Sequence, residues 1–222
     1  MKKFILFDHD GVLVNTEHWY YMANKRALAE LGIDLPLPAY LALMADGTKV
    51  WTLAQAVGVD DQRIDAARAR RDNYYQQHLM TEDIAISGVT ETLKELSSVW
   101  RMAIITTSRR VDFELIHRDR RIIDYMDFVL TVEDYARAKP HPEPYLSGLR
   151  RFHAEPSQAI VVEDSARGLK SAVAAGIDCI VVHNDFTVSH DLSAATLKIG
   201  DIRELPAIMG ELVQGSRRVR SF

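Results

Sequence analysis

The chain opens with a run of large apolar side chains that stops abruptly at acidic residues. Residues 4–7, Phe-Ile-Leu-Phe, are followed by Asp8, His9, Asp10 and Gly11. An uninterrupted apolar run of this kind is typical of a strand that is buried on both faces of a parallel sheet. Because residues two apart in a strand face the same side, Asp8 and Asp10 are expected to point into one site. The pattern therefore predicts a central strand with two carboxylates at its C-terminal end, where open α/β sheets bind their ligands.

The next segment, up to about residue 83, has helical spacing and no convincing strand. Thr16 is the predicted N-cap of its first helix. Helices are predicted over residues 17–31, around residues 39–44, up to residue 56 and over residues 60–79.

After residue 85 the pattern changes to short apolar strands that alternate with helices. Strands are predicted over residues 101–106, 128–131, 159–162 and 179–182, and helices over residues 89–96, 108–117, 142–152 and 165–176. This alternation predicts an α/β fold with a doubly wound parallel sheet, to which the opening strand also belongs. The preceding helical block is then an insertion: residues 1–15 and 86–222 form the core, and residues 16–85 form an all-helical unit that enters and leaves at the ligand end. The basic tail from Gln214 to Phe222 is expected to be frayed.

Polar residues gather at the predicted C-terminal ends of these strands. They are Thr106, Thr107 and Ser108 after one strand, Glu163, Asp164 and Ser165 after another, and Lys139 between them. Taken singly, the hydroxyl residues are predicted helix caps and the lysine a solvated side chain. As a set they indicate a site for phosphoryl transfer, because carboxylates suit Mg²⁺ and one carboxylate can attack phosphorus while a second transfers protons. Thr106 and nearby backbone N–H groups would bind phosphoryl oxygens, and Lys139 would balance their charge.

These residues carry a resemblance to a known family. Asp8-x-Asp10-Gly-Val-Leu, Thr106, Lys139-Pro and Glu163-Asp164-Ser resemble the four motifs of the haloacid dehalogenase (HAD) superfamily, and the insertion is similar to the cap of its beta-phosphoglucomutase-like phosphatase branch. The resemblance implies a Rossmann-like core with a helical cap, with Asp8 as nucleophile and Asp10 as acid and base. It implies that Mg²⁺ is held by Asp8, the backbone carbonyl of Asp10, Glu163 and Asp164, and that phosphate is bound by Thr106, Thr107 and Lys139.

The same comparison favours a particular chemistry. Dehalogenases of the superfamily lack the second aspartate, so Asp10 favours phosphate chemistry. The mutases of the branch carry two cap cations, where this chain has Lys49 as a candidate substrate ligand and, as an approximate match, Gln76. Because a mutase must hold a second phosphate, a phosphatase acting on a small phosphorylated metabolite is favoured over a sugar phosphomutase. A receiver-like phospho-switch is a remote alternative, since receivers are about half this length and lack the insertion.

Some residues have plainer interpretations. His9 is predicted to face away from the two aspartates as a hydrogen-bonded filler, and residues 68–71 to form a solvated basic face. Tyr20 is mostly cap core, with substrate contact as the alternative. Arg109 is left open between substrate contact and covering the start of a helix.

Composition limits the remaining possibilities. The formal net charge of −4 gives no electrostatic case for nucleic-acid binding, and the single cysteine, Cys179, rules out an internal disulfide. The apolar run after Lys2 and Lys3 is too short for a signal peptide, and no stretch approaches a membrane span of about 20 apolar residues. We expect a cytoplasmic enzyme, a monomer or weak dimer, whose partner is a small phosphate ester.

Overall fold

The computed structural model describes residues 2–218, and beyond residue 212 it describes the backbone only. Its centre is a six-stranded sheet in the order β3-β2-β1-β4-β5-β6, in which every neighbouring pair is parallel. The strands are β1 (Phe4–Phe7), β2 (Arg101–Ile105), β3 (Phe128–Leu130), β4 (Ala159–Glu163), β5 (Asp178–Val182) and β6 (Leu197–Ile199). The predicted doubly wound parallel sheet is confirmed, with β1 at its centre.

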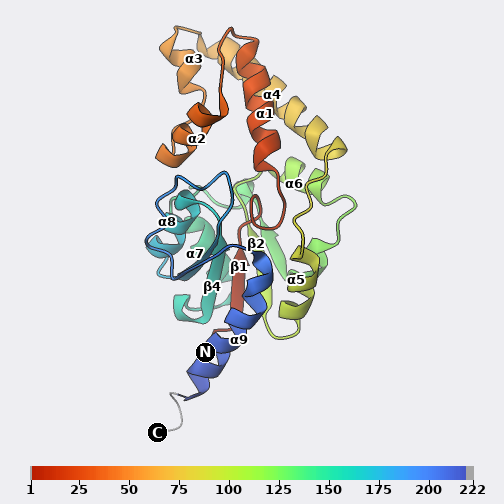
Figure 1. Ribbon diagram of the computed structural model, residues 1–222, viewed down its shortest axis with the longest axis vertical. Coiled ribbons are helices and arrows are strands. Elements are labelled where there is room, and N and C mark those ends of the chain that lie inside the picture. The colour runs from red at the N-terminus through yellow and green to blue at the C-terminus, as the bar shows by residue number, and fades with distance from the viewer. Residues whose placement is uncertain (1, 219–222) are drawn as a thin grey trace.

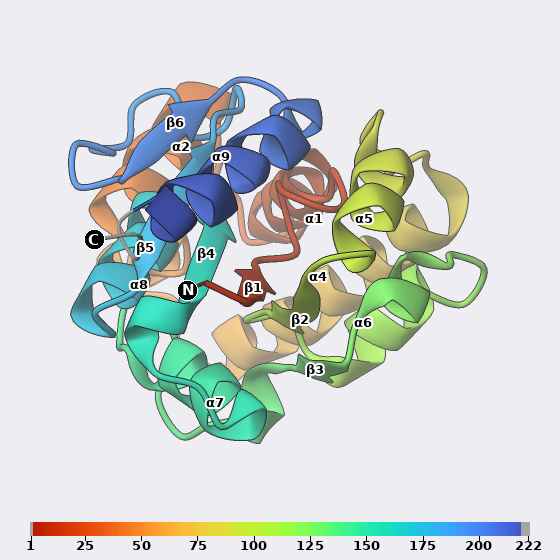
Figure 2. The same ribbon diagram turned by 90° about the horizontal axis from the view of Figure 1, so that it is seen from below.

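Helices cover both faces of this sheet (Figure 2). Ile5 and Phe7 of β1 pack toward α5 (Val89–Ser97), α6 (Arg110–Ile116) and α9 (Leu205–Arg218). Phe4 and Leu6 pack toward α7 (Glu143–Phe152) and α8 (Ala166–Ala174). Successive side chains of a strand point to opposite faces, so an all-apolar strand supplies two hydrophobic layers at once. This is why residues 4–7 contain no polar position.

Four helices lie between β1 and α5 in the chain and sit beyond the C-terminal end of the sheet (Figure 1). They are α1 (Glu17–Ala29), α2 (Leu37–Asp46), α3 (Thr52–Ala56) and α4 (Asp61–Thr81). They enclose a hydrophobic core of their own, which includes Leu28, Tyr40 and Trp51. Val14 and Ala85 form an antiparallel bridge, so the chain enters and leaves this helical unit side by side. The domain boundaries at residues 15/16 and 85/86 stay a prediction.

The C-terminal part of the sheet differs from the sequence prediction. Neither β6 nor α9 was predicted, because β6 is only three residues long and Leu197 and Lys198 are exposed. The backbone of α9 continues to Arg218, into the segment that was predicted to fray from Gln214. Residues 219–222 of that tail lie outside the described residues. Within residues 2–218, no helix is both long enough and apolar enough to cross a bilayer.

Candidate active site

Three carboxylates meet at the C-terminal edge of the sheet. Asp8 follows β1, while Glu163 ends β4 and Asp164 follows it, and the two strands are paired so that Phe7 lies beside Val162. One carboxylate oxygen from each of these residues lies within 4.8 Å of the other two. The predicted acidic cluster is therefore assembled by the register of two adjacent parallel strands.

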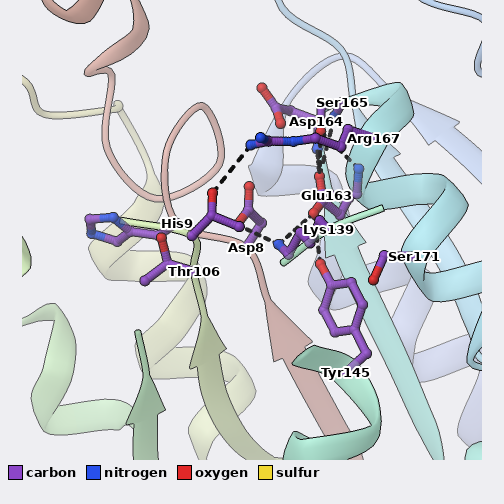
Figure 3. A network of polar contacts seen from close by, with 12 residues as sticks. Asp8, His9, Thr106, Lys139, Tyr145, Glu163, Asp164, Ser165, Arg167 and Ser171 are labelled. Carbon is purple, nitrogen blue, oxygen red and sulfur yellow. Dashed lines mark hydrogen bonds and ion pairs between the residues drawn. The ribbon is translucent and has the colours of Figure 1, made fainter. Parts of the chain in front are cut away.

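Lys139 provides the positive charge for this cluster (Figure 3). Its Nζ lies 2.7 Å from Asp8 Oδ1 and 2.7 Å from Glu163 Oε1. Tyr145 donates a further hydrogen bond of 2.7 Å to Glu163 Oε1. Three carboxylates and one ammonium leave a formal charge of −2 when all are ionised.

The electrostatics reflect burial and crowding. Burial and the neighbouring Glu163 raise the pKa of Asp8 to about 6, against the opposing effect of Lys139. Burial, Glu163 and Asp8 raise the pKa of Asp164 well above its usual range. Burial would also raise the pKa of Glu163, but the ammonium of Lys139 and its hydrogen bonds outweigh burial and lower it. Keeping Asp8 and Asp164 ionised is therefore energetically unfavourable, and a further cation in the cluster would stabilise their charged forms.

These donors fit a divalent cation such as Mg²⁺. They are hard oxygen ligands in a buried cluster with an excess of negative charge. Asp164 Oδ2 accepts a hydrogen bond of 2.8 Å from Asn184 Nδ2, and the other carboxylate oxygen of Asp164 has no partner among the described residues. Glu163, in contrast, also accepts bonds at Oε2 from the backbone N–H groups of Asp164 and Ser165. Asp8 and Asp164 thus have the freer oxygens for a metal.

Two glycines make room for the carboxylates. Gly11 has φ +80°, and a Cβ at this position would lie 2.1 Å from Asp164 Oδ2. A Cβ on Gly168, in α8, would lie 1.7 Å from Glu163 Oε1. The need for a glycine at position 168 was not predicted, because it depends on how closely α8 approaches β4.

Asp10 is held by side-chain hydroxyls. Thr16 Oγ1 donates to Asp10 Oδ1 at 2.5 Å, and Ser108 Oγ donates to Oδ2 at 2.5 Å. Thr106 Oγ1 and His9 Nδ1 each lie 3.3 Å from Oδ2. Burial would raise the pKa of Asp10, but the imidazole of His9 and these hydrogen bonds outweigh burial and lower it. The arrangement favours the carboxylate form.

This arrangement corrects two predicted helix caps. Thr16 precedes α1, and Ser108 lies two residues before α6, but neither makes a side-chain capping bond. Both hydroxyls donate to Asp10 instead, and a hydrogen bond to a carboxylate is stronger than the neutral bond that a cap accepts from a backbone N–H. Ser165 does cap its helix, accepting a bond of 3.1 Å from the N–H of Gly168.

His9 partly departs from its predicted orientation. It is fully buried and points away from Asp8 (Figure 3). Its Nε2 lies 2.9 Å from Nε2 of His117, as expected of a hydrogen-bonded filler. Its Nδ1 nevertheless reaches Asp10. The strand ends at Phe7, so the alternation of side chains does not extend to residue 10.

A cavity of about 570 Å³ lies between the sheet edge and the inserted helices. Asp8, Asp10, Asp164 and Thr107 line it from the core, and Lys49 lines it from the loop after α2. Thr106 and Lys139 are buried beneath this lining, at 0% and 5% exposure. Of the predicted substrate-binding residues, Thr107 and Lys49 therefore line the cavity, whereas Thr106 and Lys139 contact Asp10 and Asp8. Further lining residues that the sequence did not single out as site residues are Glu17, Tyr40, Arg71 and Arg167.

The basic cluster on α4 is not uniformly solvated, which corrects a prediction. Arg71 is 13% exposed in its side chain, lines the cavity and donates hydrogen bonds to Tyr20 and Asn24. Its position could have been found from the buried face of α4, because it lies four residues from both Ala67 and Tyr75. Gln76, the approximate match for a cap cation, instead donates to Asp112 at 2.9 Å.

Arg109 joins the helical unit to the core. Its guanidinium pairs with Asp72 of α4 and with Asp112 of α6, the latter at 2.8 Å. The residue lines the cavity as well, so both of the roles left open by the sequence are compatible with its place.

The geometry agrees with the match to known families. Residues 5–182 match the model of the haloacid dehalogenase-like hydrolases. The chain belongs to this family. It is 29% identical over 212 residues to validoxylamine A 7'-phosphate phosphatase of Streptomyces hygroscopicus subsp. limoneus, covering 92% of this chain and 96% of that one. It is 26% identical over 180 residues to the fructose-1-phosphate phosphatase YqaB of Escherichia coli (strain K12), covering 80% and 95%.

Solved structures support the fold. CbbY from Rhodobacter sphaeroides, in complex with phosphate, superposes with a TM-score of 0.78 at 24% identity, covering 92% of this chain and 96% of that one. The predicted membership of the HAD superfamily is confirmed, and the chain is a phosphoric monoester hydrolase of the HAD type. This removes the receiver-like phospho-switch, which is not an enzyme.

Proposed function

We propose that this protein is a Mg²⁺-dependent phosphatase that hydrolyses a small phosphorylated metabolite, such as a sugar phosphate, through an aspartyl-phosphate on Asp8. The observation that carries the proposal is the meeting of Asp8, Glu163, Asp164 and Lys139 at the C-terminal edge of the sheet, where Asp8 and Asp164 line the cavity. Mg²⁺ bound by Asp8, Asp164, Glu163 and the Asp10 carbonyl would offset the carboxylates and draw charge from a phosphate oxygen.

Asp8 has the features of a nucleophile. Lys139 occupies its Oδ1, while Oδ2 accepts no hydrogen bond from the described residues and is free to attack phosphorus. With a pKa of about 6, Asp8 is mostly ionised at pH 7, as attack requires. The P–O bond to the substrate alcohol breaks as the Asp8 Oδ2–P bond forms.

Asp10 is placed to transfer protons. The site favours its carboxylate form, so the proton that it passes to the departing alcohol oxygen is taken from the monoanionic phosphate of the substrate. The carboxylate then accepts a proton from the water that hydrolyses the aspartyl-phosphate. The hydroxyls of Thr16 and Ser108 stabilise the ionised form that the second step needs. Thr107 and Arg167, joined by a hydrogen bond of 3.2 Å, lie on the cavity wall where phosphoryl oxygens would sit.

The test is hydrolysis of a panel of sugar phosphates, phosphoglycolate, nucleotides and p-nitrophenyl phosphate, with and without Mg²⁺. Asp8→Asn should abolish turnover, and Asp178→Asn, which alters an exposed aspartate at the start of β5, should not. Asp10→Asn should slow hydrolysis of the intermediate, so intact-mass analysis of acid-quenched enzyme should reveal a phosphoryl adduct on Asp8. Normal hydrolysis by Asp8→Asn, or an adduct on another residue, would refute the mechanism.

A sugar phosphomutase is the second candidate, and one observation favours it. The cation that sequence matching did not find in the cap exists as Arg71, which faces the cavity. Arg71 is, however, already engaged by Tyr20, Asn24 and Asp72, which makes it a weaker second phosphate site. A mutase would isomerise a sugar phosphate when primed with its bisphosphate, faster than it releases inorganic phosphate.

A further inference from the structure

The cavity is also lined by polar groups that the proposed chemistry does not use. Glu17 is in the first turn of α1 and lines the cavity, yet its carboxyl group forms no hydrogen bond or ion pair within the described residues. A partly buried acid left without a partner is uncommon, because it loses solvation with nothing in return.

Tyr40 presents the same feature on another helix. It is fully buried on α2, lines the same cavity, and its hydroxyl has no partner among the described residues. Burial and the nearby Glu17 raise its pKa well above the usual range, so the group is a neutral hydroxyl that can both donate and accept. Two separate helices therefore bring unsatisfied hydrogen-bonding groups to one cavity.

The charge of Glu17 bears on which substrate body the cavity accepts. Burial, followed by the carboxylates of Asp10 and Asp8, raises the pKa of Glu17 to about 7 against the opposing effect of Arg167. Two of the arginines that line the cavity, Arg71 and Arg109, already form ion pairs with Asp72 and Asp112. Lys49, Arg68 and Arg167 also line the cavity, so it is the carboxylate of Glu17, and not a shortage of cations, that would repel an acidic substrate body.

Resting on the proposed function, we infer that the phosphate ester has an uncharged, hydroxyl-rich body, and that Glu17 and Tyr40 bind its hydroxyl groups. The substrate class is then a sugar or polyol monophosphate, and carboxylated esters such as phosphoglycolate are poorer substrates. A cavity of about 570 Å³ is within the range of sites that enclose a whole small molecule. Hydroxyl groups suit both residues, because they donate to a carboxylate and exchange hydrogen bonds with a phenol.

The experiment compares kcat/KM for three esters with the full-length protein and saturating Mg²⁺. Fructose 1-phosphate supplies hydroxyls, phosphoglycolate supplies a carboxylate, and p-nitrophenyl phosphate supplies neither. The wild-type protein should prefer fructose 1-phosphate, or another member of a hexose and pentose phosphate set, over phosphoglycolate by about 100-fold or more.

Variants of Glu17 and Tyr40 then test the two residues. For each variant the kcat/KM values of two substrates are compared as a ratio, because effects on folding and metal binding alter both values equally. Glu17→Gln should lower the ratio of kcat/KM for the best sugar phosphate to that for p-nitrophenyl phosphate by about tenfold, and Tyr40→Phe by about three- to tenfold. Glu17→Gln should also raise the relative rate with phosphoglycolate, because it removes a negative charge. Tyr21→Phe is the matched control: Tyr21 packs 5.0 Å from the Tyr40 ring, but its hydroxyl bonds Leu35 O and it does not line the cavity.

Phosphoglycolate as the best substrate, or unchanged ratios in both Glu17→Gln and Tyr40→Phe, would overturn the inference. This failure is distinguishable from failure of the proposed function. If p-nitrophenyl phosphate is hydrolysed in an Asp8-dependent manner while the ratios stay constant, only the substrate assignment is wrong. If no ester is hydrolysed, the proposed function itself fails.

Discussion

Lys139 and Glu163 form a buried ion pair, with Nζ and Oε1 2.7 Å apart and side chains that are 2% and 0% exposed. The same ammonium contacts Asp8, so it neutralises charge contributed by two strands. It belongs both to the chemistry and to the stability of the core.

Replacing Lys139 by Met should destabilise the protein, because two buried carboxylates lose their cation. In metal-free buffer the free energy of unfolding should fall by about 3–5 kcal/mol, the usual cost of breaking a buried pair on one side. Urea unfolding followed by circular dichroism measures this change. Lys94→Met removes an exposed lysine from α5 and should have little effect; equal losses in the two variants would contradict the prediction.

Gly168→Ala should disrupt the acidic cluster, although alanine normally stabilises a helix relative to glycine. The added Cβ would lie 1.7 Å from Glu163 Oε1, so either the carboxylate or α8 must move. We expect a loss of about 1–3 kcal/mol in unfolding free energy and weaker Mg²⁺ binding by calorimetry. Gly210→Ala in α9 is the control, since nothing lies within 4 Å of its Cβ position, and it should leave Mg²⁺ binding intact.

Mg²⁺ binding should weaken as the pH falls. In the metal-free protein the pKa of Asp8 is raised to about 6, so at pH 5.5 a proton must leave this carboxyl before a cation can bind. The apparent Kd for Mg²⁺, from thermal shift titrations, should rise about fourfold between pH 7.5 and pH 5.5 from Asp8 alone. A Kd that is constant over this range would show that Asp8 is not a metal ligand.

Arg109→Ala should loosen α4 from the core. The guanidinium bridges Asp72 and Asp112, and its loss leaves Gln76 and Asp112 as the remaining polar link described between these helices. Amide hydrogen exchange in α4 should become faster, while exchange in β1 and β4 should not change. Arg110→Ala provides the comparison, because Arg110 pairs with Asp134 and does not touch α4; a similar increase in that variant would argue against the bridge.

The apolar runs predicted β1, β2 and β4 well, because strands buried on both faces leave a signal that needs no knowledge of their neighbours. The three residues of β6 leave no such signal: Leu197 and Lys198 are exposed, and the strand exists only because β5 pairs with it. Short edge strands are defined by a partner, which a local pattern does not contain.

At the site, too, some side-chain roles could be predicted from the sequence and others could not. The order of Asp8, Lys139, Glu163 and Asp164 along the chain was enough to predict one acidic cluster with one lysine, since parallel strands place their carboxyl ends at a common edge. The roles of Thr16 and Ser108 as donors to Asp10 were not predictable, because a hydroxyl before a helix is also the signature of a cap.

The sequence by itself determined the layering of the protein, the position of the helical insertion and the composition of the acidic cluster, because each follows from periodicity and from residue order. Only the tertiary structure decided which groups face the cavity. It turned Arg71 inward, left Glu17 and Tyr40 without partners, and required glycine at position 168. These features depend on distances between elements that are remote in the chain, and such distances are set by packing.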